Sequence, residues 1–112
     1  MHYKTISELA PLIESSELSP VDLTRSQLDR IEALDGTLKS YAAVTSELAI
    51  EQAELAQKEI TNGKYRGKLH GIPIAVKDLF DTAGIRTMGG SAVFADNIPV
   101  EDSTVVTNLR EA

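Results

Sequence analysis

The hydrophobic and polar positions of residues 1–62 alternate with the period of amphipathic helices. Thr5 or Ser7 can cap a first short helix. A second helix is predicted to begin at Ser19 and Pro20, because serine caps helices and proline suits the first helical position, and to end at Gly36. The apolar stripes of these two helices are Ile6, Leu9, Leu12 and Ile13, then Leu23, Leu28, Ile31 and Leu34.

A third helix is predicted from Thr45 or Ser46 to about Thr61, with Asn62-Gly63 as its end. It is rich in alanine, glutamate, glutamine and leucine, which are good helix formers. An apolar stripe with this much alanine suits close packing on a neighbouring element, and a partner-binding helix is the less favoured alternative. The stripe is Leu48, Ala49, Ala53, Ala56 and Ile60.

The second half of the chain has a different pattern, with one continuous apolar run. Ile72–Lys77 is rich in β-branched residues and follows Gly71, which predicts a strand buried on both faces. Tyr41–Val44 is a brief strand-like stretch. A last helix, capped by Asp102 or Ser103, is predicted through Val105, Val106 and Leu109.

These elements make an incomplete α/β unit. A strand buried on both faces needs neighbouring strands and two covering layers, and residues 1–112 supply too few strands. We therefore expect the N-terminal fragment of a single larger α/β domain, with helices flanking a mixed sheet that the fragment leaves incomplete. Residues 1–62 would form a mainly helical layer, and residues 63–112 the lysine-bearing strand, a loop and the following helix.

Composition narrows the class of protein. The chain is 42% hydrophobic and 25% charged, which is typical of a globular protein, and its net charge of −6 argues against nucleic acid or an anionic membrane as a direct partner. No stretch approaches the roughly 20 apolar residues of a membrane span. We expect a cytoplasmic protein.

Cysteine is absent, and His2 and His70 are the two histidines. Disulfides, thiolate metal sites and cysteine nucleophiles are therefore excluded, and a histidine metal site or a Ser-His-Asp triad is disfavoured. We expect no cofactor and no metal.

Lys77 is the candidate catalytic residue. Lysine seldom enters a buried strand unless it is paired or functional, and in dry surroundings it can lose its proton and act as a base. In the alternative, the side chain reaches water at the strand end, with Asp78 adjacent, and a paired Asp78 would oppose its loss of a proton. Gly89-Gly90-Ser91 favours an ordinary turn, since a hydrolase elbow requires Gly-x-Ser-x-Gly and Ala92 follows the serine.

The run Leu69–Asp78 closely resembles the lysine segment of the amidase signature family. The similarity continues over nearly the whole chain. Segments that resemble the family's N-terminal helices, the turn after its strand, its Gly-Ser step and its next helix are Ser19–Leu23, Thr82–Thr87, Gly90-Ser91 and Pro99–Leu109.

This resemblance implies a Ser-cisSer-Lys triad that hydrolyses carboxylic amides, with Lys77 as its lysine. Lys77 would accept a proton through the bridging serine and so activate the nucleophilic serine. Both serines lie in a Gly/Ser-rich region of the family that follows the matched segments and is absent here. The 112 residues alone are therefore expected to be inactive, with a small-molecule amide as substrate of the parent protein, and Ser91 is not assigned as nucleophile.

Three alternatives stay open, two within this resemblance and one outside it, and the first is a stand-alone amidase. The Asp78-Leu79 pair is more similar to stand-alone amidases than to the glutaminase subunit of tRNA-dependent amidotransferases, which often carries Asp-Asn there and works with partner subunits. The glutaminase subunit is the second alternative. The third is a non-catalytic module whose acidic helices and unpaired strand edges favour a partner or a homodimer.

Overall fold

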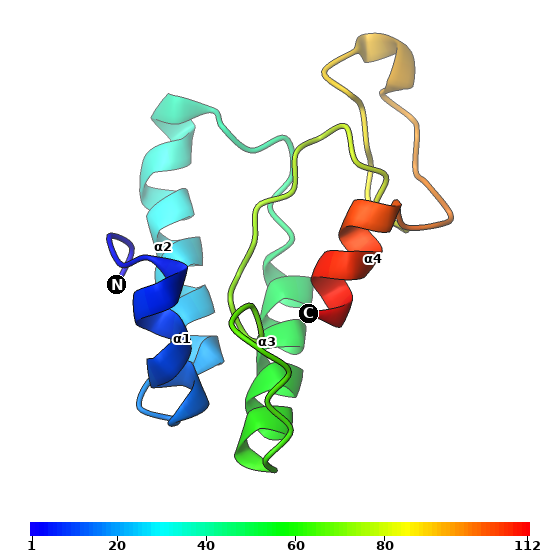
Figure 1. Ribbon diagram of the computed structural model, residues 1–112. Helices are drawn as coiled ribbons and strands as arrows, with labels where there is room; N and C mark the ends of the chain where they lie inside the picture. The colour runs from blue at the N-terminus through cyan, green and yellow to red at the C-terminus, as the bar shows by residue number, and fades with distance from the viewer. The chain divides into compact units, whose positions relative to one another are not determined.

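The computed structural model describes residues 1–112 and contains helices and loops but no β-strand (Figure 1). Its elements are α1 (Ile6–Glu14), α2 (Pro20–Leu38), α3 (Ser46–Thr61), a short 3₁₀ turn η1 (Ala92–Phe94) and α4 (Thr104–Glu111). The chain forms two compact units, Met1–Pro73 and Ile74–Ala112. None of the helices is long and apolar enough to cross a lipid bilayer.

The helices begin where the capping residues predict. The Glu8 carboxylate accepts the Thr5 backbone N–H at 2.7 Å, so α1 starts after Thr5. The Ser19 hydroxyl accepts backbone N–H groups at the start of α2, and the Ser103 hydroxyl does so at the start of α4. Because these side chains satisfy donors that a helix leaves unpaired, they fix the helix starts locally. The predicted starts are confirmed.

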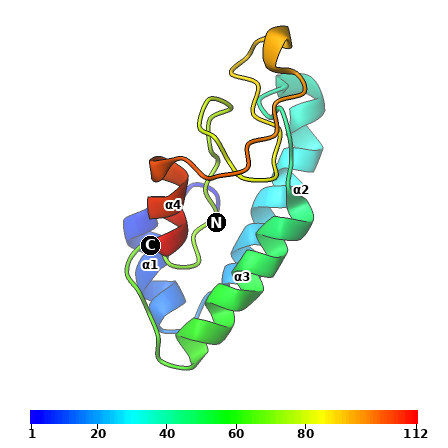
Figure 2. The same ribbon diagram turned by 90° about the vertical axis from the view of Figure 1, so that its right-hand side faces the viewer.

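In the Met1–Pro73 unit, α2 and α3 run side by side (Figures 1 and 2). Ala53 and Ala56 of α3 are buried, so the alanine stripe faces the inside of this unit as predicted. A cluster of buried side chains from all three helices forms the core: Leu9, Ile13, Leu23 and Ile60. Small residues let helix backbones approach closely, and the larger side chains fill the space beside them.

The predicted end of α2 at Gly36 is wrong. The helix continues to Leu38, and Lys39 follows in the left-handed conformation with φ = 51°. Its N–H donates to the Asp35 carbonyl at 2.8 Å, and the Ser40 N–H donates to the Asp35 carboxylate at 2.7 Å. A left-handed residue closes the last helical turn, and this role usually falls to glycine. Here the side chain of Asp35 supports a lysine in that position.

The strand predictions for Ile72–Lys77 and Tyr41–Val44 are also wrong, and with them the sheet of the expected α/β fold. Ile72–Lys77 passes through the structure without a partner strand, and the sole ladder contact is an isolated bridge between Thr82 and Ile85. A strand exists only where a second strand accepts its hydrogen bonds. Ile74 and Val76 are consequently 44% and 41% exposed rather than buried.

Replacing Leu23 with alanine should lower the free energy of unfolding of the chain by about 2–5 kcal/mol, because it leaves a cavity in the core of the Met1–Pro73 unit. Leu23 is 1% exposed, whereas Leu55 on α3 is 57% exposed. Urea unfolding followed by circular dichroism measures the change. Leu55→Ala is the matched control and should change the free energy by less than about 0.5 kcal/mol. Equal effects of the two substitutions would contradict this core.

Candidate functional site

Lys77 lies at the start of a tight turn in the Ile74–Ala112 unit. Its carbonyl oxygen accepts the N–H of Leu79 at 2.8 Å and that of Phe80 at 3.1 Å. The side chain is exposed and forms no ion pair. The expected dry surroundings are therefore not observed, because the segment before Lys77 has no covering layers. The backbone of Lys77 is fixed by the turn, and its amine is unpaired.

The Lys77 side chain reaches water, as in the alternative prediction, and Asp78 does not pair with it but bonds to the loop that follows. One carboxylate oxygen, Oδ1, accepts the backbone N–H of Met88 at 2.9 Å. The Asp78 carbonyl accepts the N–H of Gly89 at 2.6 Å. Two consecutive amides are thus held by one residue, and hydrogen bonds from N–H to a carboxylate are among the stronger ones in proteins.

A double-glycine turn follows these two bonds. Gly89 and Gly90 have φ values of 60° and 72°, in the left-handed region that glycine enters without strain. The turn delivers Ser91, whose hydroxyl accepts the Val93 N–H at 3.3 Å and starts η1. The observed role of Ser91 is therefore to cap a 3₁₀ turn, and the sequence prediction of an ordinary turn at this position is confirmed.

Thr87 anchors the same loop from its other side. Its N–H donates to the Asn97 carbonyl at 3.0 Å, and the Asn97 side-chain amide donates to the Thr87 carbonyl at 2.9 Å. The Thr87 side chain is buried, with 6% exposed. Further along, the Asp102 carboxylate accepts the Ala83 N–H at 2.7 Å and forms an ion pair with Arg110 of α4 at 3.1 Å. Side chains thus supply acceptors at several points of this unit, beside the backbone carbonyls of its turns.

A shallow cleft of about 190 Å³ lies between the turn that follows Lys77 and the loop that contains Met88 and Gly89. Its walls also include Leu79 and Phe94. Sites for small organic ligands usually enclose about 300–1,000 Å³ and cover most of the ligand. The cleft is therefore too small and too open to serve by itself as a complete substrate pocket. No group of three or more metal-binding side chains occurs in the chain.

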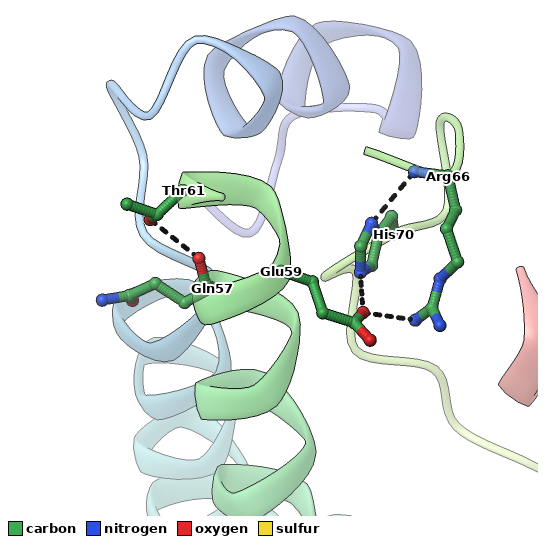
Figure 3. Close-up of polar contacts among 5 residues, drawn as sticks. All are labelled: Gln57, Glu59, Thr61, Arg66 and His70. Carbon is green, nitrogen blue, oxygen red and sulfur yellow. Dashed lines mark hydrogen bonds and ion pairs between the residues drawn. The ribbon is translucent and has the colours of Figure 1, made fainter. Parts of the chain in front are cut away.

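A second polar cluster lies in the Met1–Pro73 unit and centres on His70 (Figure 3). His70 is 2% exposed. Its Nε2 lies 2.9 Å from the Glu59 carboxylate of α3, and its Nδ1 accepts the Arg66 backbone N–H at 3.1 Å. The Arg66 guanidinium forms an ion pair with the same Glu59 oxygen at 3.3 Å. Tyr65 stacks on the imidazole, with ring centroids 6.0 Å apart.

These contacts assign the protonation state of His70. Because Nδ1 accepts a hydrogen bond, it carries no proton, so Nε2–H donates to Glu59 and the ring is neutral. Burial lowers the pKa of His70 below its ordinary value of 6.5, and the nearby Arg66 charge lowers it further, while Glu59 opposes the shift. Both ring nitrogens are occupied by Glu59 and Arg66, so His70 has no free nitrogen to activate a serine, and its role is structural.

No pattern along the chain pointed to the role of either Asp78 or His70. Asp78 and Met88 are ten residues apart, and His70 and Glu59 eleven, with no helical or strand period between them. Such pairs are formed by the folded loop, and a sequence pattern with a fixed period does not detect them.

Lowering the pH should destabilise the chain through His70. Because the folded-state pKa is depressed, the unfolded chain binds more protons below about pH 6.5, so the free energy of unfolding should fall as the pH drops through that value. The loss should level off once the pH is below the folded-state pKa. Urea unfolding at intervals between about pH 7.5 and 5.5, above the range of most carboxylates, measures it.

His70→Gln should remove most of this slope, since glutamine does not titrate. His2→Gln is the matched control, because His2 is exposed and solvent screens its interactions, and this variant should keep most of the slope. An unchanged slope in His70→Gln would assign the pH dependence to other groups.

Comparison with known proteins places these observations in a family. The family model described as Amidase matches residues 22–112. The protein named as amidase AmiD in Mycobacterium tuberculosis is 46% identical over 107 residues, which is 96% of this chain and 22% of that protein. The A-type subunit of the glutamyl-tRNA(Gln) amidotransferase of Thioalkalivibrio sulfidiphilus is 44% identical over 110 residues, or 98% of this chain and 22% of that protein.

A solved structure agrees with this assignment. It is described with the words "An unexpected vestigial protein complex reveals the evolutionary origins of an s-triazine catabolic enzyme", and one of its chains superposes with a TM-score of 0.90 at 29% identity. The match covers 96% of this chain and 24% of that chain. The present chain thus spans about a fifth to a quarter of the length of these relatives and corresponds to their N-terminal part.

Proposed function

Because the chain belongs to the amidase family, we propose that Lys77 is the proton acceptor of an amide hydrolase of which residues 1–112 form the N-terminal part. The observation that carries the proposal is the unpaired amine of Lys77 at a fixed turn, within the segment that resembles the family's lysine motif. A base must be free to reach the group from which it takes a proton.

In the proposed reaction, a serine hydroxyl outside these residues attacks the carbonyl carbon of the amide. Its proton passes through the bridging serine to the Lys77 amine, and the C–N bond breaks as the leaving amine takes up a proton. Water then hydrolyses the acyl-enzyme and releases the acid. Residues 1–112 contribute the proton acceptor and the loop that follows it, and the nucleophile comes from the family's Gly/Ser-rich region.

Burial of Lys77 is a requirement of this proposal that residues 1–112 do not meet. A lysine becomes an effective base when its charged form is disfavoured by dry surroundings. We expect the remaining parts of a protein of the relatives' length to cover Lys77, together with the exposed side chains of Ile74 and Val76. The 112-residue chain by itself should then show no amide turnover.

Lys77→Ala should lower kcat for amide hydrolysis by about 10³-fold or more, because members of a catalytic triad act as a unit. The test uses the full product of the reading frame that encodes these residues, assayed for release of ammonia or amine from simple carboxylic amides. Lys64→Ala is the control, since Lys64 is exposed and forms no ion pair. Retained turnover in Lys77→Ala, with a normal unfolding temperature, would remove the proposal.

A second candidate function is the glutaminase subunit of a tRNA-dependent amidotransferase. It is favoured by the similarity to A-type subunits of amidotransferases, which reaches 44% identity, whereas Leu79 after Asp78 favours a stand-alone amidase. Affinity purification from the native host decides between them. Copurified partner subunits with glutamine-dependent ammonia release would identify the amidotransferase, and turnover of simple amides without a partner would identify the stand-alone enzyme.

A further inference from the structure

We propose that Asp78 is a positioning residue that holds Lys77 through the Met88–Gly89 loop. This inference rests on the function proposed for Lys77 and adds a second residue to it. Asp78 is not placed in contact with the substrate. Its effect on the reaction is exerted through the backbone that it shares with Lys77.

The geometry on the C-terminal side of Lys77 carries this inference. Asp78 is bonded at two points, through its carboxylate to Met88 and through its carbonyl to Gly89, at 2.9 and 2.6 Å. Together with the turn that begins at the Lys77 carbonyl, these bonds restrain the backbone that follows the lysine. Ile72–Val76, on its N-terminal side, has no strand partner. The direction of Lys77 therefore depends on the Asp78 bonds more than on the preceding segment.

The loop that receives these bonds is itself fixed. Thr87, next to Met88, is buried and bonded to Asn97 in both directions. Gly89 continues into the left-handed turn. A carboxylate bonded to a fixed loop transmits that loop's position to its own backbone, so Asp78 connects Lys77 to a loop that is itself bonded at Thr87.

The same bonds explain why Asp78 leaves the lysine available. A carboxylate next to a lysine in sequence can pair with the ammonium group and hold it protonated. Here the Asp78 carboxylate bonds to the Met88 amide, and no ion pair with Lys77 forms. The role assigned to Asp78 is thus that of a hydrogen-bond acceptor, and asparagine has an acceptor oxygen in a side chain of the same shape.

Two nearly isosteric substitutions test this role in the full product of the reading frame. Asp78→Leu removes the acceptor and should lower kcat by about 100-fold, the effect of a small misplacement of a catalytic group, with KM changed by less than about threefold. Asp78→Asn keeps an acceptor for the Met88 N–H and should retain kcat within about fivefold. Asp96→Leu is the control, because Asp96 is exposed and its side chain is in no ion pair, and it should leave kcat unchanged.

Each outcome supports or overturns the role of Asp78. An Asp78→Asn variant as impaired as Asp78→Leu would show that the charge, and not the hydrogen bond, is needed, and would overturn the proposal. An unaffected Asp78→Leu variant would overturn it as well. If Asp78→Leu does not fold, the Asn variant decides by the same fivefold criterion. Lys77→Ala, assayed in parallel, separates the two proposals: its retained turnover removes the function of Lys77, whereas its loss combined with a failed Asn variant removes only the role of Asp78.

Discussion

A backbone N–H that leaves water needs an acceptor, and this constraint governs the Ile74–Ala112 unit more than apolar packing does. Val106 is its buried apolar side chain, while Val93 and Val100 are 85% and 92% exposed. With no strand ladder and one short α-helix, the unit obtains its acceptors from backbone carbonyls in turns and, at a few points, from side chains such as those of Asp78 and Asp102. Its order therefore depends on individual polar residues.

The Met1–Pro73 unit satisfies the same constraint differently. Its three helices pair their own backbone groups, which leaves their apolar faces free to form a core around Leu23 and Ile60. The polar side chain of His70 is nevertheless buried beside that core. Burial of a polar side chain is tolerable only when its hydrogen bonds are made, and both ring nitrogens of His70 have partners, Glu59 and Arg66. The cluster joins the loop at residues 65–70 to α3.

Features set by contacts between neighbouring residues were predicted correctly from the sequence, whereas features that depend on more distant contacts were not. Helix starts were predictable because a cap such as Ser19 and the amides it satisfies lie within three residues. The strand predicted at Ile72–Lys77 is absent, since a strand depends on a partner that its own residues do not specify. The end of α2 was misplaced because Asp35 stabilises a left-handed lysine, for which no composition rule exists. Lys77 was predicted from its place at the end of an apolar run and from a resemblance to a family motif, whereas the contacts of Asp78 became visible only in the folded loop.

Holding a lysine in place and making it reactive are separate physical tasks, and the function proposed for Lys77 requires both. The position of the Lys77 backbone is set by hydrogen bonds, and Asp78 accepts one of them from Met88, ten residues further along the chain. Reactivity depends on the removal of water, which needs large covering surfaces, and the exposed side chain of Lys77 lacks them here. Under the function proposed above, residues 1–112 would orient the lysine, and the remaining part of a protein of the relatives' length would cover it.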